Sequence, residues 1–210
     1  MSQSRPEEQL LIEGPAGPLE VVLTRAEQPT ALAVICHPHP LHGGTLHNKV
    51  VHTLMRAARD QGASTVRFNF RGVGKSIGEH DDGRGETADC LAVIDWARRE
   101  LGDLPLWVMG FSFGGYVAAA AASQLQQWPQ RLVLVAPSVE RMPFADLMPL
   151  TGPATVLMGE ADEVVASEAV FDMLEGQPGV DMQRFAATGH FFHGKLVELK
   201  AAAERSLAEH

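Results

Sequence analysis

Two patterns of hydrophobic and polar positions alternate along this chain. Short strand-like runs, of which 31–36 and 131–136 are nearly all apolar, alternate with longer stretches that have apolar residues on one helical face. The strand-like runs are residues 10–12, 19–23, 31–36, 64–70, 106–109, 131–136, 154–158 and 181–185. The helix-like stretches are residues 50–58, 87–101, 116–125, 167–174 and 195–208.

This alternation predicts an α/β fold with about eight strands. Strands separated by helices form a mostly parallel sheet that is covered by helices on both faces. The first two runs are an exception, because the turn sequence Gly-Pro-Ala-Gly-Pro at 14–18 joins them and predicts an antiparallel N-terminal hairpin. No linker, repeat or low-complexity segment interrupts the pattern, so we expect a single domain over residues 1–210.

Composition and charge narrow the class of protein. The chain is 45% hydrophobic and 20% charged, which is typical of a globular domain. Its net charge of −9 argues against a nucleic-acid or anionic-membrane partner. It has no apolar run of transmembrane length, and residues 1–8 lack the apolar stretch of a signal peptide. Two cysteines, Cys36 and Cys90, are too few for a disulfide framework. From these three absences together we expect a cytoplasmic protein.

Residues 110–115, Gly-Phe-Ser-Phe-Gly-Gly, form the motif most indicative of chemistry. The G-x-S-x-G pattern lies between a predicted strand and a predicted helix, the context in which it forms a nucleophile elbow. A Cβ at Gly110 or Gly114 would clash across so tight a turn, and the turn would present the hydroxyl of Ser112 at its apex. The alternative interpretation is a glycine-rich structural turn with an incidental serine.

A nucleophilic serine needs a base and an orienting acid. Asp162 follows the strand-like run 154–158 and is the predicted acid, with the neighbouring carboxylates Glu160 and Glu163 as alternatives. His190 follows the next strand-like run and is the predicted base, with His193 as the competing candidate. The chain order serine, acid, histidine is the one expected after such an elbow.

The reaction also needs N–H donors for the oxyanion. One is expected to be the backbone N–H of Phe113, and the second is expected from the loop after the third strand, Cys-His-Pro-His-Pro-Leu-His-Gly-Gly at 36–44. Pro38 and Pro40 have no N–H, so His39 is the predicted donor and Leu41 the alternative. The histidines of this loop could instead bind a metal, but no carboxylate lies between residues 31 and 59, and we expect neither metal nor other cofactor.

The glycine-rich stretch 71–76 imitates part of a P-loop. The pattern fails because the position of the first glycine, residue 69, is Asn, and no helix is predicted directly after Ser76. Nucleotide binding is therefore not expected. Arg71 and Ser76 could brace loops of the site, although an ordinary loop role explains them equally well.

Together these motifs resemble the α/β-hydrolase superfamily, in particular small bacterial serine hydrolases. The resemblance rests on His-Pro-His-Pro at 37–40, Asn-x-Arg-Gly-x-Gly-x-Ser at 69–76 and the elbow at 110–115, and it covers roughly residues 10–205. It implies an eight-strand-type sheet and a Ser112–Asp162–His190 triad. Many members of the superfamily insert a helical lid where this chain has only the short segment 137–153, so we expect little or no lid.

The expected function is hydrolysis of a small carboxylic ester or thioester through an acyl-enzyme. A shallow pocket for the acyl chain is predicted to involve Leu41, Met142 and Phe144. The alternative is a non-catalytic relative of the same fold that binds a ligand or a partner. An intact serine, acid and histidine set favours the enzyme, because a binding module has no need for all three.

Overall fold

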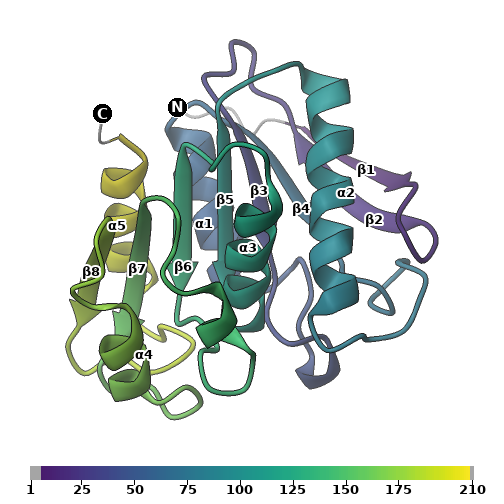
Figure 1. Cartoon of the computed structure of the whole chain (residues 1–210). Coiled ribbons are helices and arrows are strands. Elements are labelled where there is room, and N and C mark those ends of the chain that lie inside the picture. Colours follow the sequence, from purple (N-terminus) through teal and green to yellow (C-terminus); the bar gives the residue numbers. More distant parts are fainter. Residues whose placement is uncertain (1–5, 209–210) are drawn as a thin grey trace.

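The computed structural model describes residues 6–208 and contains one eight-stranded sheet (Figure 1). The strand order is β1-β2-β4-β3-β5-β6-β7-β8. β2 pairs antiparallel with β1 and with β4, and every other neighbouring pair is parallel. The strands are β1 (Glu7–Ile12), β2 (Leu19–Thr24), β3 (Leu32–Cys36), β4 (Ser64–Phe68), β5 (Leu106–Phe111), β6 (Arg131–Val135), β7 (Ala154–Gly159) and β8 (Val180–Phe185).

Helices cover both faces of this sheet, and the predicted α/β class with its antiparallel N-terminal hairpin is confirmed. In Figure 1, α2 and α3 lie in front of the sheet, whereas α1 and α5 pack together behind it. The helices are α1 (Lys49–Asp60), α2 (Arg84–Leu101), α3 (Phe113–Gln124), α4 (Ser167–Leu174) and α5 (Leu196–Ala208), with short 3-10 turns η1 (Pro40–His42) and η2 (Phe144–Leu147). Residues 1–5, part of the segment used to argue against a signal peptide, lie outside the described residues.

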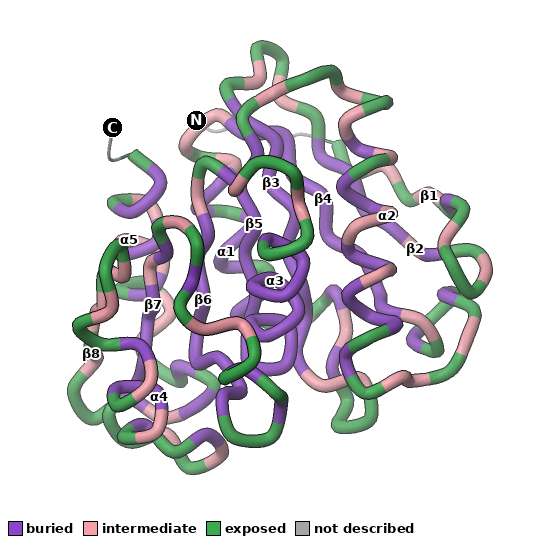
Figure 2. The backbone as a smooth tube through the Cα atoms, in the orientation of Figure 1, coloured by how far each residue is buried: buried purple, intermediate pink, exposed green. Residues whose placement is uncertain are grey.

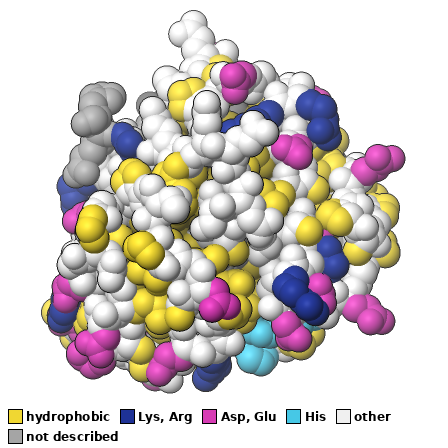
Figure 3. Space-filling view, viewed as in Figure 1, with side chains coloured by type: hydrophobic (Ala, Val, Ile, Leu, Met, Phe, Trp, Pro, Cys, Tyr) yellow, Lys and Arg dark blue, Asp and Glu magenta, His cyan; other side chains and the backbone are white. Residues whose placement is uncertain are grey.

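The core follows the central strands (Figure 2). All residues of β3, β4 and β5 are buried, as expected for strands covered on both faces, whereas the edge strands β1 and β8 keep exposed positions. The face of the molecule drawn in Figure 3 mixes acidic and basic side chains over scattered apolar ones. Within residues 6–208, no helix is long and apolar enough to cross a membrane.

Several elements begin or end away from their predicted limits, and local contacts explain the differences. β4 ends at Phe68, so Asn69 and Phe70 enter the loop that follows instead of extending the strand. α2 begins at Arg84 because the side chain of Glu86 accepts a hydrogen bond from the N–H of Gly83 at 2.9 Å and caps the first turn. α3 begins at Phe113, directly after Ser112.

Candidate active site

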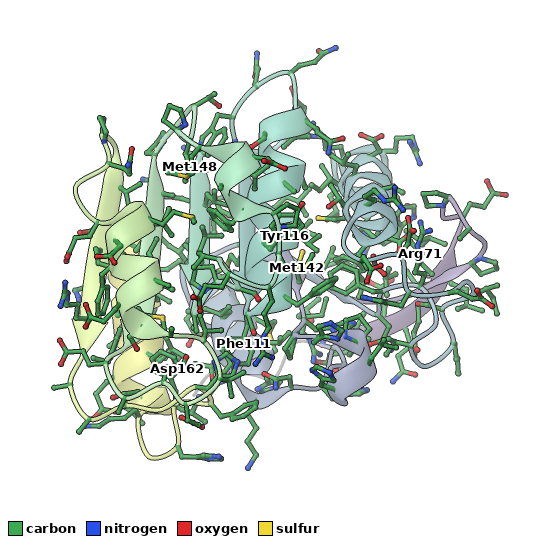
Figure 4. The ribbon with its side chains drawn as sticks, turned by 60° about the horizontal axis from the view of Figure 1, so that its bottom comes forward. Arg71, Phe111, Tyr116, Met142, Met148 and Asp162 are labelled. Carbon is green, nitrogen blue, oxygen red and sulfur yellow. The ribbon has the colours of Figure 1, made fainter. Side chains whose placement is uncertain are left out.

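The candidate site lies where the parallel strands β3, β5, β7 and β8 end, at the lower edge of the molecule in Figure 1. The carboxyl ends of parallel strands meet at one edge of an α/β sheet, and ligands bind there in open α/β folds. Figure 4 turns this edge toward the reader and labels Asp162 and Phe111 close to each other.

Ser112 occupies the sharp turn between β5 and α3. Its backbone has φ 58° and ψ −115°, a conformation that costs free energy for a residue with a side chain. A Cβ on Gly110 would lie 2.0 Å from the carbonyl oxygen of Gly114, and a Cβ on Gly114 would lie 2.3 Å from that of Cys36. Both glycines are therefore required by close backbone approach, as the sequence pattern predicts.

Backbone hydrogen bonds hold this strained turn in place. The N–H of Ser112 donates to the carbonyl oxygen of Val135 at 2.9 Å, which ties the turn to β6. The carbonyl oxygen of Ser112 accepts from the N–H of Gly115 at 2.9 Å and from that of Ser138 at 3.2 Å. These three backbone hydrogen bonds therefore fix Ser112, and 7% of its surface remains exposed.

Asp162 and His190 are in direct contact. The Nδ1 atom of His190 lies 2.7 Å from Oδ2 of Asp162, and the other oxygen, Oδ1, accepts from the N–H groups of Val164 and Val165 at 2.8 Å each. With Nδ1–H donating to the carboxylate, the neutral imidazole has its lone pair on Nε2. His190 lines the same cavity as Ser112.

The alternative acids, Glu160 and Glu163, and the alternative base, His193, do not line the cavity of Ser112. Glu163 accepts a hydrogen bond from the backbone N–H of His190 at 3.1 Å, so it contacts the loop and not the imidazole. Glu160 is exposed at the end of β7. His193 is also exposed, and its ring faces Phe191 at 6.1 Å.

The two residues predicted to supply the oxyanion donors are neighbours through their side chains. The rings of His39 and Phe113 are 5.0 Å apart, and both residues line the cavity of Ser112 and His190. Within residues 6–208, neither backbone N–H donates to an acceptor. The N–H of Leu41, the alternative donor, instead bonds to Nδ1 of His39 at 3.2 Å. Burial and the neighbouring His42 lower the pKa of His39, so its imidazole is neutral at pH 7.

His37 fixes the loop that carries His39, a role that the sequence did not reveal. Its Nε2 accepts from the N–H of Phe70 at 3.1 Å, and its Nδ1–H donates to the carbonyl oxygen of Pro38 at 2.7 Å. One neutral tautomer satisfies both bonds. Burial lowers the pKa of His37 to about 4, since a charged ring would lose its hydration and could no longer accept from Phe70.

The stretch 69–76, which imitates a P-loop, braces the neighbouring loops. Oδ1 of Asn69 accepts from the N–H of Leu46 at 2.8 Å, and the hydroxyl of Ser76 donates to the carbonyl oxygen of Asn69 at 2.6 Å. The guanidinium of Arg71 is paired with the buried carboxylate of Asp89 at 2.8 Å. Arg71 lies well away from Asp162 in Figure 4, on the side of α2.

A cavity of about 140 Å³ contains Ser112 and His190. Larger hollows, of about 250 and 610 Å³, lie elsewhere on the chain, and their linings lack these residues, so chemistry rather than size identifies the site. The lining residues are Pro38, His39, His42, Gly43, Gly44, Asn48, Ser112, Phe113, Ser138, Arg141, Val164, Val165, His190 and Phe191.

The residues predicted to line an acyl pocket lie elsewhere, which corrects that part of the sequence analysis. Phe144 is fully buried in the core, and Met142 is buried beside Tyr116 and near it in Figure 4. Leu41 is 67% exposed on η1. The apolar wall of the cavity consists of Val164, Val165 and Phe191, from loops whose composition gave no periodic signal.

The histidine-rich loop raised the alternative of a metal site. Within residues 6–208, no group of three or more His, Cys, Asp or Glu side chains is arranged to hold a metal ion. The rings of His39 and His42 stack on each other at 4.2 Å, and Nδ1 of His37 is already bonded to Pro38. Cys36 and Cys90 are free thiols that lie 3.5 Å apart in the core.

Comparison with known proteins agrees with this architecture. Residues 41–155 match the family described as alpha/beta hydrolase fold. An α/β serine hydrolase homologue from Coxiella burnetii is 42% identical, with a TM-score of 0.92 over 99% of this chain and 100% of that one. A lidless α/β serine hydrolase from Xanthomonas campestris is 40% identical, with a TM-score of 0.89 over 99% and 95%. An uncharacterized protein of Rickettsia prowazekii is 31% identical over 92% of this chain and 86% of its own.

Proposed function

The chain belongs to the α/β-hydrolase fold family, and we propose that it is a serine hydrolase that cleaves small carboxylic esters or thioesters. Ser112 is the nucleophile, His190 the general base and Asp162 the residue that orients the imidazole. One observation carries the proposal: His190 contacts Asp162 through Nδ1 at 2.7 Å and shares a cavity with a serine held in a strained elbow. A ligand-binding relative would have no need for this arrangement.

Acylation begins when Oγ of Ser112 attacks the carbonyl carbon of the substrate. Nε2 of His190 accepts the hydroxyl proton as the new O–C bond forms, and the imidazolium is stabilised by the carboxylate of Asp162. The tetrahedral intermediate then collapses, the bond to the leaving alkoxide or thiolate breaks, and His190 returns the proton to it. The N–H groups of Val164 and Val165 hold the other oxygen of the Asp162 carboxylate, which fixes it beside the imidazole.

The negative charge on the carbonyl oxygen is stabilised by the N–H groups of Phe113 and His39. Both are without an internal acceptor in the described part of the chain, and Phe113 is the first residue of α3. The first N–H groups of a helix have no intrahelical partner, and the helix dipole favours negative charge there. Fixed donors of this kind are commonly worth a factor of about 10²–10³ in kcat each.

Deacylation repeats the same proton transfers with water. His190 removes a proton from a water molecule, whose oxygen attacks the acyl carbon, and the acyl–Oγ bond breaks as Ser112 recovers its proton. Water can reach the acyl-enzyme because segment 136–153 forms only the short turn η2 and no lid. A cavity of about 140 Å³ favours short acyl chains.

Covalent labelling with a fluorophosphonate probe tests this proposal. The wild-type chain is expected to be labelled once, and Ser112→Ala should abolish both labelling and ester hydrolysis. Ser123→Ala is the matched control, since Ser123 is exposed near the other end of the same helix and bonds only to the carbonyl oxygen of Ala119. Labelling of Ser112→Ala at the wild-type rate would refute the assignment.

A further inference from the structure

The side chains that line the cavity beside Ser112 include a positive charge but no negative one. The chain as a whole is acidic, with 26 Asp and Glu against 17 Lys and Arg, yet no Asp or Glu lines the cavity. The lining includes one permanent cation, Arg141, together with polar groups such as Asn48 and Ser138. A cavity of this kind attracts an anion and repels a cation.

The guanidinium of Arg141 is free to bind a ligand. Arg71 and Arg67 are engaged by Asp89 and Glu7, whereas Arg141 has no salt bridge or hydrogen bond within residues 6–208. Its five N–H donors form a planar fork that matches a carboxylate or a phosphate. An unpaired arginine at the wall of a reaction cavity is therefore suited to hold an anionic part of the substrate.

The backbone that carries Arg141 is fixed relative to the nucleophile. The N–H of Ser138 donates to the carbonyl oxygen of Ser112 at 3.2 Å, and Val139 and Met142, two residues before the arginine and one after it, are buried. Phe144 adds a further anchor, because its fully buried ring packs edge-on against Tyr116 at 6.2 Å. The buried neighbours thus hold the segment in place and leave the Arg141 side chain at the cavity.

Within residues 6–208, no carboxylate forms a salt bridge with this cation, and Glu140, its exposed neighbour in the chain, does not line the cavity. The carboxylate of Asp162 accepts from two backbone N–H groups and from His190, and Glu163 accepts from the N–H of His190. Asp162 is thus engaged by the imidazole, and Glu163 by the backbone of the loop that carries it. The open charge that a substrate meets in the cavity is positive.

We propose that Arg141 is a specificity-determining residue and that the substrate is an ester or thioester with an anionic group, a carboxylate or a phosphate, close to its scissile carbonyl. The inference rests on the proposed serine hydrolase function. The anion can belong to the acyl part or to the leaving group, and the two sources share the same chemistry. Arg141 binds this anion and so lowers KM for such substrates, without taking part in proton transfer.

Matched pairs of substrates test the proposal. In the acyl arm, mono-4-nitrophenyl adipate is compared with neutral 4-nitrophenyl hexanoate, and in the leaving-group arm, 4-acetoxybenzoate is compared with 4-acetoxybenzamide. The quantity measured is the ratio of kcat/KM for the anionic ester to that for the neutral ester, with the Ser112→Ala rate subtracted. The arm with the higher ratio identifies the part of the substrate that carries the anion.

Variants at Arg141 then test whether this residue causes the preference for the anionic ester. Arg141→Gln is expected to lower the ratio about tenfold, equivalent to about 1.4 kcal/mol, mainly through KM, with a much smaller effect on hydrolysis of the neutral ester. Arg141→Lys should recover part of the ratio, and added salt should lower the wild-type ratio. Arg56→Gln is the matched control, because Arg56 is exposed on α1 and lines a separate cavity of about 370 Å³.

Three results would overturn the inference. The ratio could stay unchanged in Arg141→Gln, both esters could slow equally in that variant, or Arg56→Gln could lower the ratio as much. If fluorophosphonate labelling of Ser112 persists in any of these cases, only the role of Arg141 fails. If neither ester is hydrolysed and Ser112 is not labelled, the serine hydrolase function itself is refuted and the inference falls with it.

Discussion

Replacing His37 by Asn should destabilise the fold in a manner that depends on pH. In the native chain, Nδ1–H of His37 donates to the carbonyl oxygen of Pro38 and Nε2 accepts from the N–H of Phe70. An Asn side chain can place its amide near the position of Nδ1, but it is too short to reach Phe70. His37→Asn therefore leaves one buried N–H without an acceptor, which costs about 1–3 kcal/mol at pH 7.5.

The pH dependence follows from the lowered pKa of His37. Between its ordinary pKa of 6.5 and the folded-state pKa of about 4, the unfolded chain binds a proton that the folded chain does not. The free energy of unfolding therefore rises with pH over this range, and the stability is lost as pH falls. From pH 7.5 to pH 4.5 the wild-type chain should lose about 2–3 kcal/mol through this single group.

The variant lacks this titration, so the stability difference between the two proteins should shrink by the same amount. His37→Asn is expected to be less stable than wild type by about 2 kcal/mol at pH 7.5 and to match or slightly exceed it at pH 4.5. Urea unfolding followed by fluorescence of the three tryptophans, at four pH values between these limits, measures the difference directly.

His47→Asn provides the control for this experiment. His47 is exposed and belongs to the same histidine-rich region, so its replacement should change stability little at any pH. A stability difference between wild type and His37→Asn that stays constant from pH 7.5 to 4.5 would refute the structural role assigned to His37. The same conclusion would follow if His47→Asn reproduced the pH dependence.

Further predictions concern the reacting groups. Asp162→Asn should reduce kcat by up to ~10⁴, because the amide allows the wrong imidazole tautomer, and a smaller loss than in Glu163→Gln would move the orienting role to Glu163. Steady-state ester hydrolysis should be abolished in His190→Ala and retained in His193→Ala, whereas the reverse would reassign the base. Gly114→Ala should prevent the elbow from forming and lower the thermal midpoint, and a wild-type midpoint would contradict the 2.3 Å approach to Cys36. 4-Nitrophenyl acetate and butyrate should be better substrates by kcat/KM than long-chain esters, and an optimum at long acyl chains would contradict the small cavity.

The sequence predicts the architecture well because burial on both faces leaves a strong local signal. The strands β3, which is wholly apolar, and β6, which is apolar after Arg131, were expected close to their observed limits, as was the amphipathic α1. β1 was expected only at residues 10–12, because its first half is Glu-Glu-Gln, which an edge strand tolerates on its exposed side. Asn69 and Phe70 were expected in β4, which instead ends at Phe68. The N–H of Phe70 donates to Nε2 of His37 and not to a neighbouring strand, and the apolar pattern of the sequence does not reveal this bond.

The candidate site was predictable where its residues belong to a motif or lie at a strand end. Ser112, Asp162 and His190 satisfy that condition, and the structure brings them to one edge of the sheet. The cavity wall was not predictable, because segment 136–153 has no periodicity that tells which apolar side chain faces the core. Phe144 and Met142 face inward there, whereas the exposed Arg141 lines the cavity.

In the proposed mechanism, Ser112 forms a covalent acyl-enzyme with the help of His190. Rapid mixing of the chain with 4-nitrophenyl butyrate, acid quenching and mass spectrometry of the intact protein and its peptides detect this intermediate. We expect a transient mass increase of one butyryl group per chain, located on Ser112 and absent in both Ser112→Ala and His190→Ala. Steady turnover of the ester with no acylated Ser112, or with the acyl group on another residue, would contradict this mechanism.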